Sequence, residues 1–287
     1  MTAIPKYIQW ALDEPYPLSE AQRLFFRQNG FVKLKDVLSK ELVEYMDITI
    51  TEEVSRLNTQ HISLEERDTY GKAFLQIKNI WTVSESVKQI VFGKRMARLA
   101  TELLGVQGVR MYHDQALYKE PGGGITPWHA DQYYWPLASD KTVTLWAPLQ
   151  PTPMELGPIE FSAQSNRLTK GRHLKIGDES QQVLETLLAQ EGFQQVAESF
   201  DPGEVSFHSG WLYHRAGMNQ SQHIRKVMTI IYMDKDMKLK EPENENQIED
   251  WQVWCPQATV DAVIDTPLNP VLFEWDKAQI TYSTGAL

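Results

Sequence analysis

A histidine and an aspartate stand two residues apart near the middle of the chain, at His129 and Asp131, directly after a glycine-rich stretch. Successive side chains of an extended strand point to opposite faces, so we expect these two to project from the same face of one short strand. An imidazole and a carboxylate side by side can bind a metal ion. With 7 His and 38 acidic residues in 287, about one such pair is expected by chance, so its meaning depends on the rest of the chain.

A second histidine and an arginine follow downstream. His214 lies after a turn and a short apolar stretch, and Arg225 comes eleven residues later, at the start of an apolar run that predicts a strand. Two histidines and one carboxylate on one face of a metal, with the other positions open, form the facial triad of non-haem Fe(II) oxygenases. An arginine on a neighbouring strand can bind the far carboxylate of 2-oxoglutarate through two parallel hydrogen bonds.

These residues resemble the pattern of the phytanoyl-CoA dioxygenase family of Fe(II)/2-oxoglutarate oxygenases, and the resemblance extends over most of residues 18 to 234. The family has a Trp-His-x-Asp motif after a Gly-rich loop, a distal histidine five residues before an asparagine, and an arginine eleven residues after that histidine. The matching positions here are His129, Asp131, His214, Asn219 and Arg225. The chain departs from the family at residues 163–166, where Ala-Gln-Ser-Asn stands in place of Pro-Gly-Ser-His.

The resemblance implies His129, Asp131 and His214 as iron ligands, Arg225 as the residue that holds the co-substrate, and Fe(II), 2-oxoglutarate and O2 as cofactors. It implies hydroxylation of an unactivated C–H group of a small-molecule metabolite, with release of succinate and CO2. Related halogenating enzymes lack the carboxylate, so Asp131 disfavours halogenation. Desaturation, ring formation and epoxidation stay open.

The strands that must hold these residues lie in the centre of the chain. Residues 109–119 and 142–149 alternate in character, which predicts two strands with one face toward a site. In the first, that face is expected to contain Met111, His113, Gln115, Leu117 and Lys119. We place Gln115 and, from the second strand, Trp146 in the cofactor pocket.

Helices come before these strands. The patterns predict helices over residues 18–30, with Ser19 as N-cap and Gly30 past the end, over 39–57 and over 92–104. Helices followed by many short strands with Gly and Pro turns are typical of a mainly β protein with flanking helices. We therefore expect a double-stranded β-helix, a cupin-like jelly roll.

The whole chain is expected to form a single Fe(II)/2-oxoglutarate dioxygenase domain. Residues 1–108 would give helical support, and 109–234 the jelly-roll core with an insertion at 166–195. The insertion begins with basic residues and contains a predicted helix from about 178 to 190. The tail, 235–287, is rich in aromatic residues and is expected to pack on the core or at an interface.

Composition narrows the partners. With 28 basic and 38 acidic residues the net charge is −10, which disfavours nucleic acid or an anionic membrane as a partner. The single cysteine, Cys255, excludes an internal disulfide and fits a reducing compartment. No stretch approaches the ~20 apolar residues of a membrane span. We expect a cytoplasmic protein that acts on a small molecule; the sequence indicates neither its substrate nor its oligomeric state.

Other interpretations compete with this one. His208 could replace His214 as a ligand, but Asn219 and Arg225 keep the family spacing only from His214, so His208 is predicted to support the structure. The main rival function is a catalytically silent jelly-roll protein that binds metal or 2-oxoglutarate as a sensor. A cupin-like isomerase would need neither the co-substrate nor Arg225. A hydrolase built on the His113–Asp114 pair has little support, because no Ser or Cys motif accompanies it.

Overall fold

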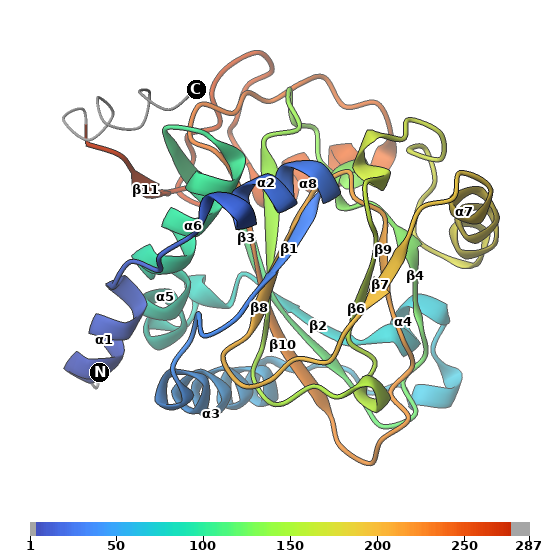
Figure 1. Ribbon diagram of the computed structural model, residues 1–287, viewed down its shortest axis with the longest axis horizontal. Coiled ribbons are helices and arrows are strands. Elements are labelled where there is room, and N and C mark those ends of the chain that lie inside the picture. Colours follow the sequence, from blue (N-terminus) through green and yellow to red (C-terminus); the bar gives the residue numbers. More distant parts are fainter. Residues whose placement is uncertain (1–3, 277–287) are drawn as a thin grey trace.

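Two antiparallel sheets form the centre of the computed structural model, which describes residues 4–276 (Figure 1). The larger sheet has the order β1-β8-β5-β10-β3-β11, with β2 paired to β3 off this path. Its strands are β1 (Phe31–Leu34), β2 (Leu75–Lys78), β3 (Gly108–Lys119), β5 (Thr142–Pro148), β8 (Val205–Ser209), β10 (Arg225–Asp234) and β11 (Val271–Glu274). The smaller sheet, in the order β4-β9-β6-β7, contains β4 (Thr126–His129), β6 (Ile159–Ser162), β7 (Gln195–Ala197) and β9 (His214–Ala216). This is the expected mainly β jelly roll.

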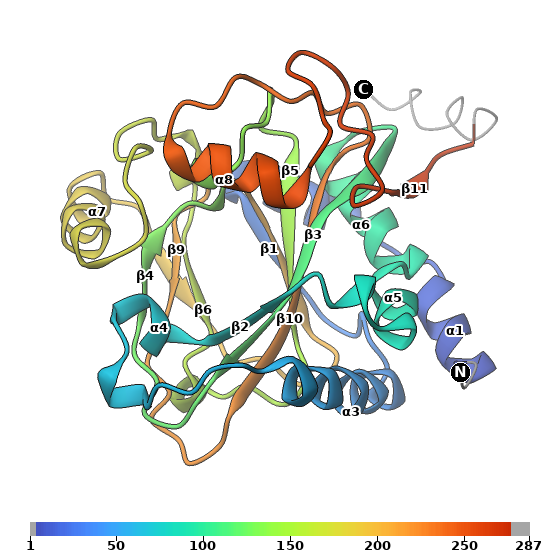
Figure 2. The same cartoon turned by 180° about the vertical axis from the view of Figure 1, so that it is seen from behind.

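Helices flank the sheets, as Figures 1 and 2 show from opposite sides. They are α1 (Lys6–Asp13), α2 (Glu20–Asn29), α3 (Lys40–Leu57), α4 (Thr69–Ala73), α5 (Glu85–Val91), α6 (Lys94–Leu104), α7 (Asp178–Gln190) and α8 (Glu245–Trp254). The main hydrophobic core lies between the amino-terminal helices and the outer face of the larger sheet, where Val143, Leu145 and Ala147 of β5 are buried. The helices therefore leave the inner face of that sheet to the site.

Local sequence signals set most helix ends. Ser19 caps α2 by accepting a hydrogen bond from the backbone of Gln22, and Gly30 ends it in the left-handed conformation at φ 79°. The prediction of one helix over 92–104 was wrong at its start. The chain breaks at Gly93, which separates α5 from α6 and lies against Leu12 of α1, where an added Cβ would approach that side chain to 3.1 Å.

A β-bulge changes the predicted face of β3. His113 pairs with Ile231 of β10, but the next pair is Met111 with Tyr232, so Tyr112 is an extra residue. The bulge reverses the alternation of side chains beyond it. His113 consequently faces the inside of the jelly roll, whereas Met111 is buried in the helix-covered core. The prediction that Met111 shares the inner face was therefore wrong.

The predicted insertion contains α7, at the bounds expected from the sequence. Most of its basic residues are engaged by the protein itself: Lys170 pairs with Glu191 at 2.8 Å, and the guanidinium of Arg172 lies over Trp211 at 4.3 Å. The tail after β10 contains α8 and β11, and its last part, 277–287, lies outside the described residues. The division of the chain into one domain stays a prediction.

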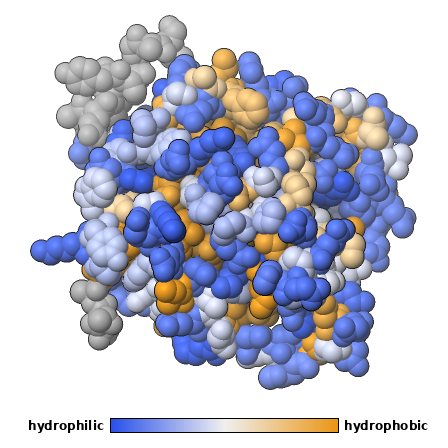
Figure 3. Space-filling view, turned by 60° about the horizontal axis from the view of Figure 1, so that its bottom comes forward, coloured by the Kyte–Doolittle hydropathy of each residue, from blue (hydrophilic) through white to orange (hydrophobic). Residues whose placement is uncertain are grey.

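The surface seen in Figure 3 is mainly hydrophilic, with hydrophobic residues scattered in small groups. Single exposed apolar side chains are normal on proteins. Within residues 4–276, no helix combines the length and the apolar character that a bilayer crossing requires.

Candidate metal centre

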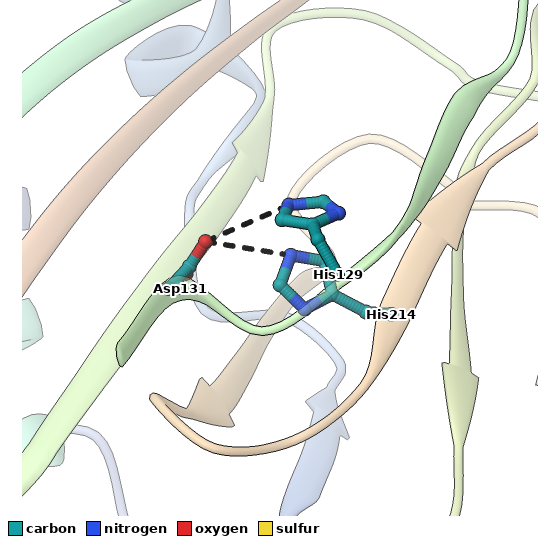
Figure 4. Close-up of side chains that lie close together, drawn as sticks. All are labelled: His129, Asp131 and His214. Atoms are coloured by element: carbon teal, nitrogen blue, oxygen red, sulfur yellow. Dashed lines mark ion pairs between the residues drawn. The ribbon is translucent and has the colours of Figure 1, made fainter. Parts of the chain in front are cut away.

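His129, Asp131 and His214 come together although 83 residues separate the last two in the sequence. The end of β4 and the start of β9 pair in register, which brings the two histidines opposite each other with ring centroids 4.2 Å apart. The Nε2 atom of each lies 3.7 Å from Oδ1 of Asp131. Figure 4 shows the three side chains directed toward one another. One potential ligand atom of each lies within 4.8 Å of the others.

Asp131 reaches this position from a turn and not from the strand itself. β4 ends at His129, Ala130 is still extended at φ −125° and ψ 129°, and Asp131 opens the 3-10 turn η3 (Asp131–Tyr134). The expectation that one strand holds both residues was therefore wrong at its last residue. The extended conformation of Ala130 is what keeps the two side chains on one side.

Hydrogen bonds to the backbone fix the tautomer of both histidines. Nδ1–H of His129 donates to the carbonyl of Pro127 at 2.7 Å, and Nδ1–H of His214 donates to the carbonyl of Leu212 at 3.0 Å. The proton on Nδ1 leaves the lone pair of each Nε2 free, on the side of Asp131. Such outer contacts orient histidine ligands in metal sites.

Both imidazoles are also neutral at physiological pH. Burial, with a contribution from the facing histidine, lowers the pKa of His129 to about 4. The pKa of His214 falls to about 4 through burial and the nearby His208. Metal binding requires unprotonated imidazole, so neither residue has to lose a proton first.

One oxygen of Asp131 is held by the protein and the other is left for a metal. Oδ2 accepts a hydrogen bond from Thr144 Oγ1 at 2.9 Å and one from His208 Nε2 at 3.3 Å. Burial alone would raise the pKa of Asp131, but the surrounding histidines, His214 and His208 first, hold it below its usual range. The carboxylate is therefore ionised, with Oδ1 facing both Nε2 atoms.

Arg225 is a buried cation without an acidic partner in the described part of the chain. It is 1% exposed, its Nη1 donates to the carbonyl of Gly157 at 2.6 Å, and its Nε has no hydrogen-bond partner among residues 4–276. Burial lowers its pKa to about 10, which keeps it charged at neutral pH, and no carboxylate of residues 4–276 forms an ion pair with it. An unpaired buried charge is costly, so this guanidinium fits an anionic ligand.

The two other predicted cofactor residues lie in the same cavity. Trp146 lines it with the guanidinium of Arg225 5.8 Å from its ring. Gln115 also lines it and accepts a hydrogen bond from Gln76 at 2.5 Å. Lys119, in contrast, is fully buried and donates to the carbonyls of Gly124 and Gly217, which ties β3 to the glycine-rich loop.

The model of the phytanoyl-CoA dioxygenase (PhyH) family matches residues 26–227 of this chain, which is more than half of it. The chain belongs to the phytanoyl-CoA dioxygenase family. The expected resemblance is thereby confirmed. A search of the curated proteins found no match.

Solved structures of Fe(II)/2-oxoglutarate enzymes share the fold. The non-haem alpha-ketoglutarate-dependent carbocyclase SnoK from nogalamycin biosynthesis is 20% identical, with a TM-score of 0.74 over 90% of this chain and 99% of that one. The epimerase SnoN in complex with Fe3+, alpha-ketoglutarate and nogalamycin RO is 22% identical, with a TM-score of 0.70 over 88% and 98%. EctD from S. alaskensis with 2-oxoglutarate and 5-hydroxyectoine is 18% identical, with a TM-score of 0.67 over 88% of each chain. At these identities the likeness establishes a common fold.

A cavity of about 410 Å³ opens on the three residues in this member of the phytanoyl-CoA dioxygenase family. Its size is within the ~300–1,000 Å³ of small-molecule sites. Aromatic side chains form much of the wall, namely Tyr70, Phe74, Tyr134, Trp135, Trp146 and Trp254. Of the aromatic residues next to the motif, Tyr134 and Trp135 line the cavity, whereas Trp128 is fully buried with Arg215 over its ring.

The structure adds two residues that sequence reasoning did not assign to the centre. Thr144 lies on the predicted inner face of β5, beside Trp146, but nothing in its type distinguishes it from any strand threonine. His208 supports the centre directly through Asp131, as the neighbour of Thr144 across the β5–β8 pair. The sequence does show a histidine at position 208 in a predicted apolar strand, but only the pairing of β8 with β5 shows that it contacts Asp131.

Proposed function

We propose that the protein is an Fe(II)- and 2-oxoglutarate-dependent dioxygenase that hydroxylates an unactivated C–H group of a small molecule, with release of succinate and CO2. The observation that carries this proposal is the pairing of a prepared donor set with a buried arginine in one cavity. Two Nε2 lone pairs and one carboxylate oxygen converge, and Arg225 lies in the same cavity with no acidic partner from residues 4 to 276.

The donor set suits Fe(II). Two imidazoles and one carboxylate on one side, with the remaining positions open, are the ligands of non-haem iron oxygenases. His129, Asp131 and His214 would hold the ion, and Thr144 and His208 would keep the carboxylate in position. When bound, iron and 2-oxoglutarate supply the oxidative decarboxylation that couples O2 to attack on a C–H bond.

The remaining residues would bind the co-substrate and keep water away from the reacting group. Arg225 would hold the far carboxylate of 2-oxoglutarate in place, because its fork of donors matches a carboxylate. Trp146 and Gln115 would form the wall beside the co-substrate, and the aromatic lining would keep water from the reacting C–H group. Hydroxylation is proposed over halogenation because Asp131 occupies the place that halogenating relatives leave free.

The test is the spectrum of the anaerobic protein with Fe(II) and 2-oxoglutarate, followed by succinate release on admission of O2. We expect a weak visible charge-transfer band and succinate from the wild type, and neither from Asp131→Ala. Asp140→Ala, which removes an exposed carboxylate, is the matched control and should behave as wild type. A wild-type protein with neither band nor succinate would defeat the proposal; a band without any succinate would indicate the sensor.

A further inference from the structure

The end of the cavity beneath α8 contains polar groups that the metal centre does not use. His113 of β3, Lys78 of β2, and Asp250 and Trp254 of α8 all line the cavity there. We call these four residues the α8 subsite. In Figure 2, α8 lies in front of β5, and it lies beyond residue 227, where the family match ends.

The bulge in β3 aims two neighbouring residues at α8. Tyr112 donates a hydrogen bond to Asp250 at 3.3 Å, and the ring of His113 stacks on Trp254 with centroids 4.5 Å apart and planes at 26°. The Nζ atom of Lys78 lies over the same indole at 5.2 Å. Bulges next to binding sites often re-aim side chains in this way.

His113 is a buried polar side chain whose ring nitrogens have no partner in the part of the chain that the structure describes. It is 6% exposed, and its Nδ1 makes no hydrogen bond to the described residues. Its Nε2 makes no hydrogen bond to any residue between 4 and 276, and the ring lines the cavity. Burial, and then the charge of Lys78, lowers the pKa of His113 to about 3, so the ring is neutral. An unpaired buried polar atom costs free energy that a ligand hydrogen bond would recover.

Groups of opposite charge type stand beside this imidazole. Burial raises the pKa of Asp250 to about 7 against the opposing effect of Lys78, so this carboxyl can accept a hydrogen bond without carrying a full negative charge at neutral pH. An ion bound here would be desolvated and would leave a net charge in the cavity. A neutral hydroxyl avoids that cost, because its oxygen can accept from an N–H and its hydrogen can be donated to the carboxyl of Asp250.

The sheet register gives the span from the α8 subsite to the metal centre. His113 pairs with Ile231 of β10, which pairs with Thr144 of β5, and Thr144 holds Asp131. Two strand spacings amount to ~10 Å. A fused ring system can extend over this distance and stack on the aromatic walls.

We propose that Lys78, His113, Asp250 and Trp254 recognise the substrate, and that they select a neutral planar ring system carrying a hydroxyl group. This rests on the proposed function in one respect only, which is that the bound ring extends toward the metal centre.

The experiment compares naphthol, naphthoate and naphthylmethylammonium, which share one ring body and differ in charge. Their binding to the full-length protein, loaded anaerobically with Fe(II) and 2-oxoglutarate, is measured by calorimetry. We expect naphthol to bind at least about tenfold more tightly than either ion, as the loss of about one hydrogen bond or the burial of a charge would require. Equal or tighter binding of an ion, or no binding of naphthol, would overturn the proposal.

Two variants locate the interaction. His113→Phe keeps a ring to stack on Trp254 but removes the nitrogen atoms, so naphthol should bind about tenfold more weakly. Asp250→Asn leaves Lys78 without its opposing charge, so preference should shift toward naphthoate. Val253→Ala, at a position of α8 that is 44% exposed, is the control and should change nothing. Naphthol affinity that is unchanged in His113→Phe would overturn the proposal.

The dioxygenase function and the ligand preference of the α8 subsite can be tested independently of each other. The charge-transfer band, recorded for each variant, reports only on iron and 2-oxoglutarate. If the wild type lacks the band, the dioxygenase assignment fails, and the same three probes titrated into metal-free protein still decide whether the α8 subsite selects a neutral ring.

Discussion

The three converging metal-binding residues are held in place by hydrogen bonds within the protein, whereas the imidazole beneath α8 is not. The Nδ1 atoms of His129 and His214 and the Oδ2 atom of Asp131 are all hydrogen-bonded, which leaves the converging donor atoms of these three residues free. In the α8 subsite, Nδ1 of His113 has no partner within residues 4–276, and Asp250 accepts one hydrogen bond there, at 3.3 Å. The hydrogen bonds at the metal end fix the positions of the three metal ligands, whereas the α8 subsite keeps polar atoms that can bind a ligand.

The two ends also differ in how they relate to the family match of residues 26–227. The metal end contains strands β4, β5, β8 and β9, all within that match. The α8 subsite takes Lys78 and His113 from within the match and Asp250 and Trp254 from a helix beyond it. Strands of a rigid core hold a reaction centre precisely enough for chemistry, and peripheral segments are where binding preferences change. We therefore propose that the core carries the reaction and that α8 and its neighbours select the substrate.

The largest effect should come from Arg225, which serves the metal end. Arg225→Met should weaken 2-oxoglutarate binding by roughly 100-fold, because a charge-assisted hydrogen-bonded pair contributes ~1.5–3 kcal/mol. Arg225→Lys keeps the charge without the fork and should lie between Met and wild type. Titration of 2-oxoglutarate into the anaerobic Fe(II) protein measures this. If Arg225→Met binds 2-oxoglutarate as tightly as the wild type, Arg225 does not bind the co-substrate.

Thr144→Val should weaken Fe(II) binding by roughly 10- to 100-fold, because it removes one of the two donors to Asp131. The variant keeps the shape of the side chain, so the fold should be preserved. Competition with a chelator gives the affinity. Thr142→Val, at another buried threonine of the same strand, is the control, since Thr142 bonds Gln132 instead of Asp131. Equal losses in both variants would mean that Thr144 has no special role.

Trp254→Leu should separate the two ends. It removes the ring that stacks on His113, so the free energy of unfolding should fall by about 2 kcal/mol because buried aromatic area is lost. Fe(II) and 2-oxoglutarate affinities should stay within about twofold of wild type, since the metal end has its own hydrogen bonds. Thermal unfolding and the charge-transfer titration measure the two quantities. A lost band would show that the two ends are not independent.

The smallest effect concerns pH. Burial lowers the pKa of His113 from its ordinary value of 6.5 to about 3, so below about pH 6.5 the unfolded chain binds a proton that the folded protein does not. The free energy of unfolding therefore falls as the pH drops below 6.5, by at most about 1.4 kcal/mol for each pH unit, and this loss is absent above that pH. Buried Asp250 acts in the opposite direction, because burial raises its pKa to about 7.

The difference in the free energy of unfolding between the wild type and His113→Phe gives the contribution of the histidine alone, because Asp250 is present in both proteins. We expect the wild type to lose stability relative to the variant between pH 6.5 and pH 5, as followed by urea unfolding. A constant difference over that range would mean that His113 is protonated in the folded protein as readily as in the unfolded chain.

Sequence patterns predicted several elements well, because their signals are local. Ser19 and Gly30 mark the ends of α2, and the helix at 178–190 was predicted at its observed bounds. The alternation along β5 correctly placed Trp146 on the inner face. The break at Gly93 and the bulge at Tyr112 were missed, since both depend on how the segment packs against elements distant in sequence.

The sequence by itself determined the donor types, their spacing and the family to which the chain belongs, because a metal constrains which side chains can bind it. Only the tertiary structure decided that Thr144 and His208 hold Asp131, that Arg225 is buried with no acidic partner among the described residues, and that α8 completes the cavity. Hydrogen bonds between distant strands depend on sheet register, and a one-residue bulge is enough to reverse which side chains face the site.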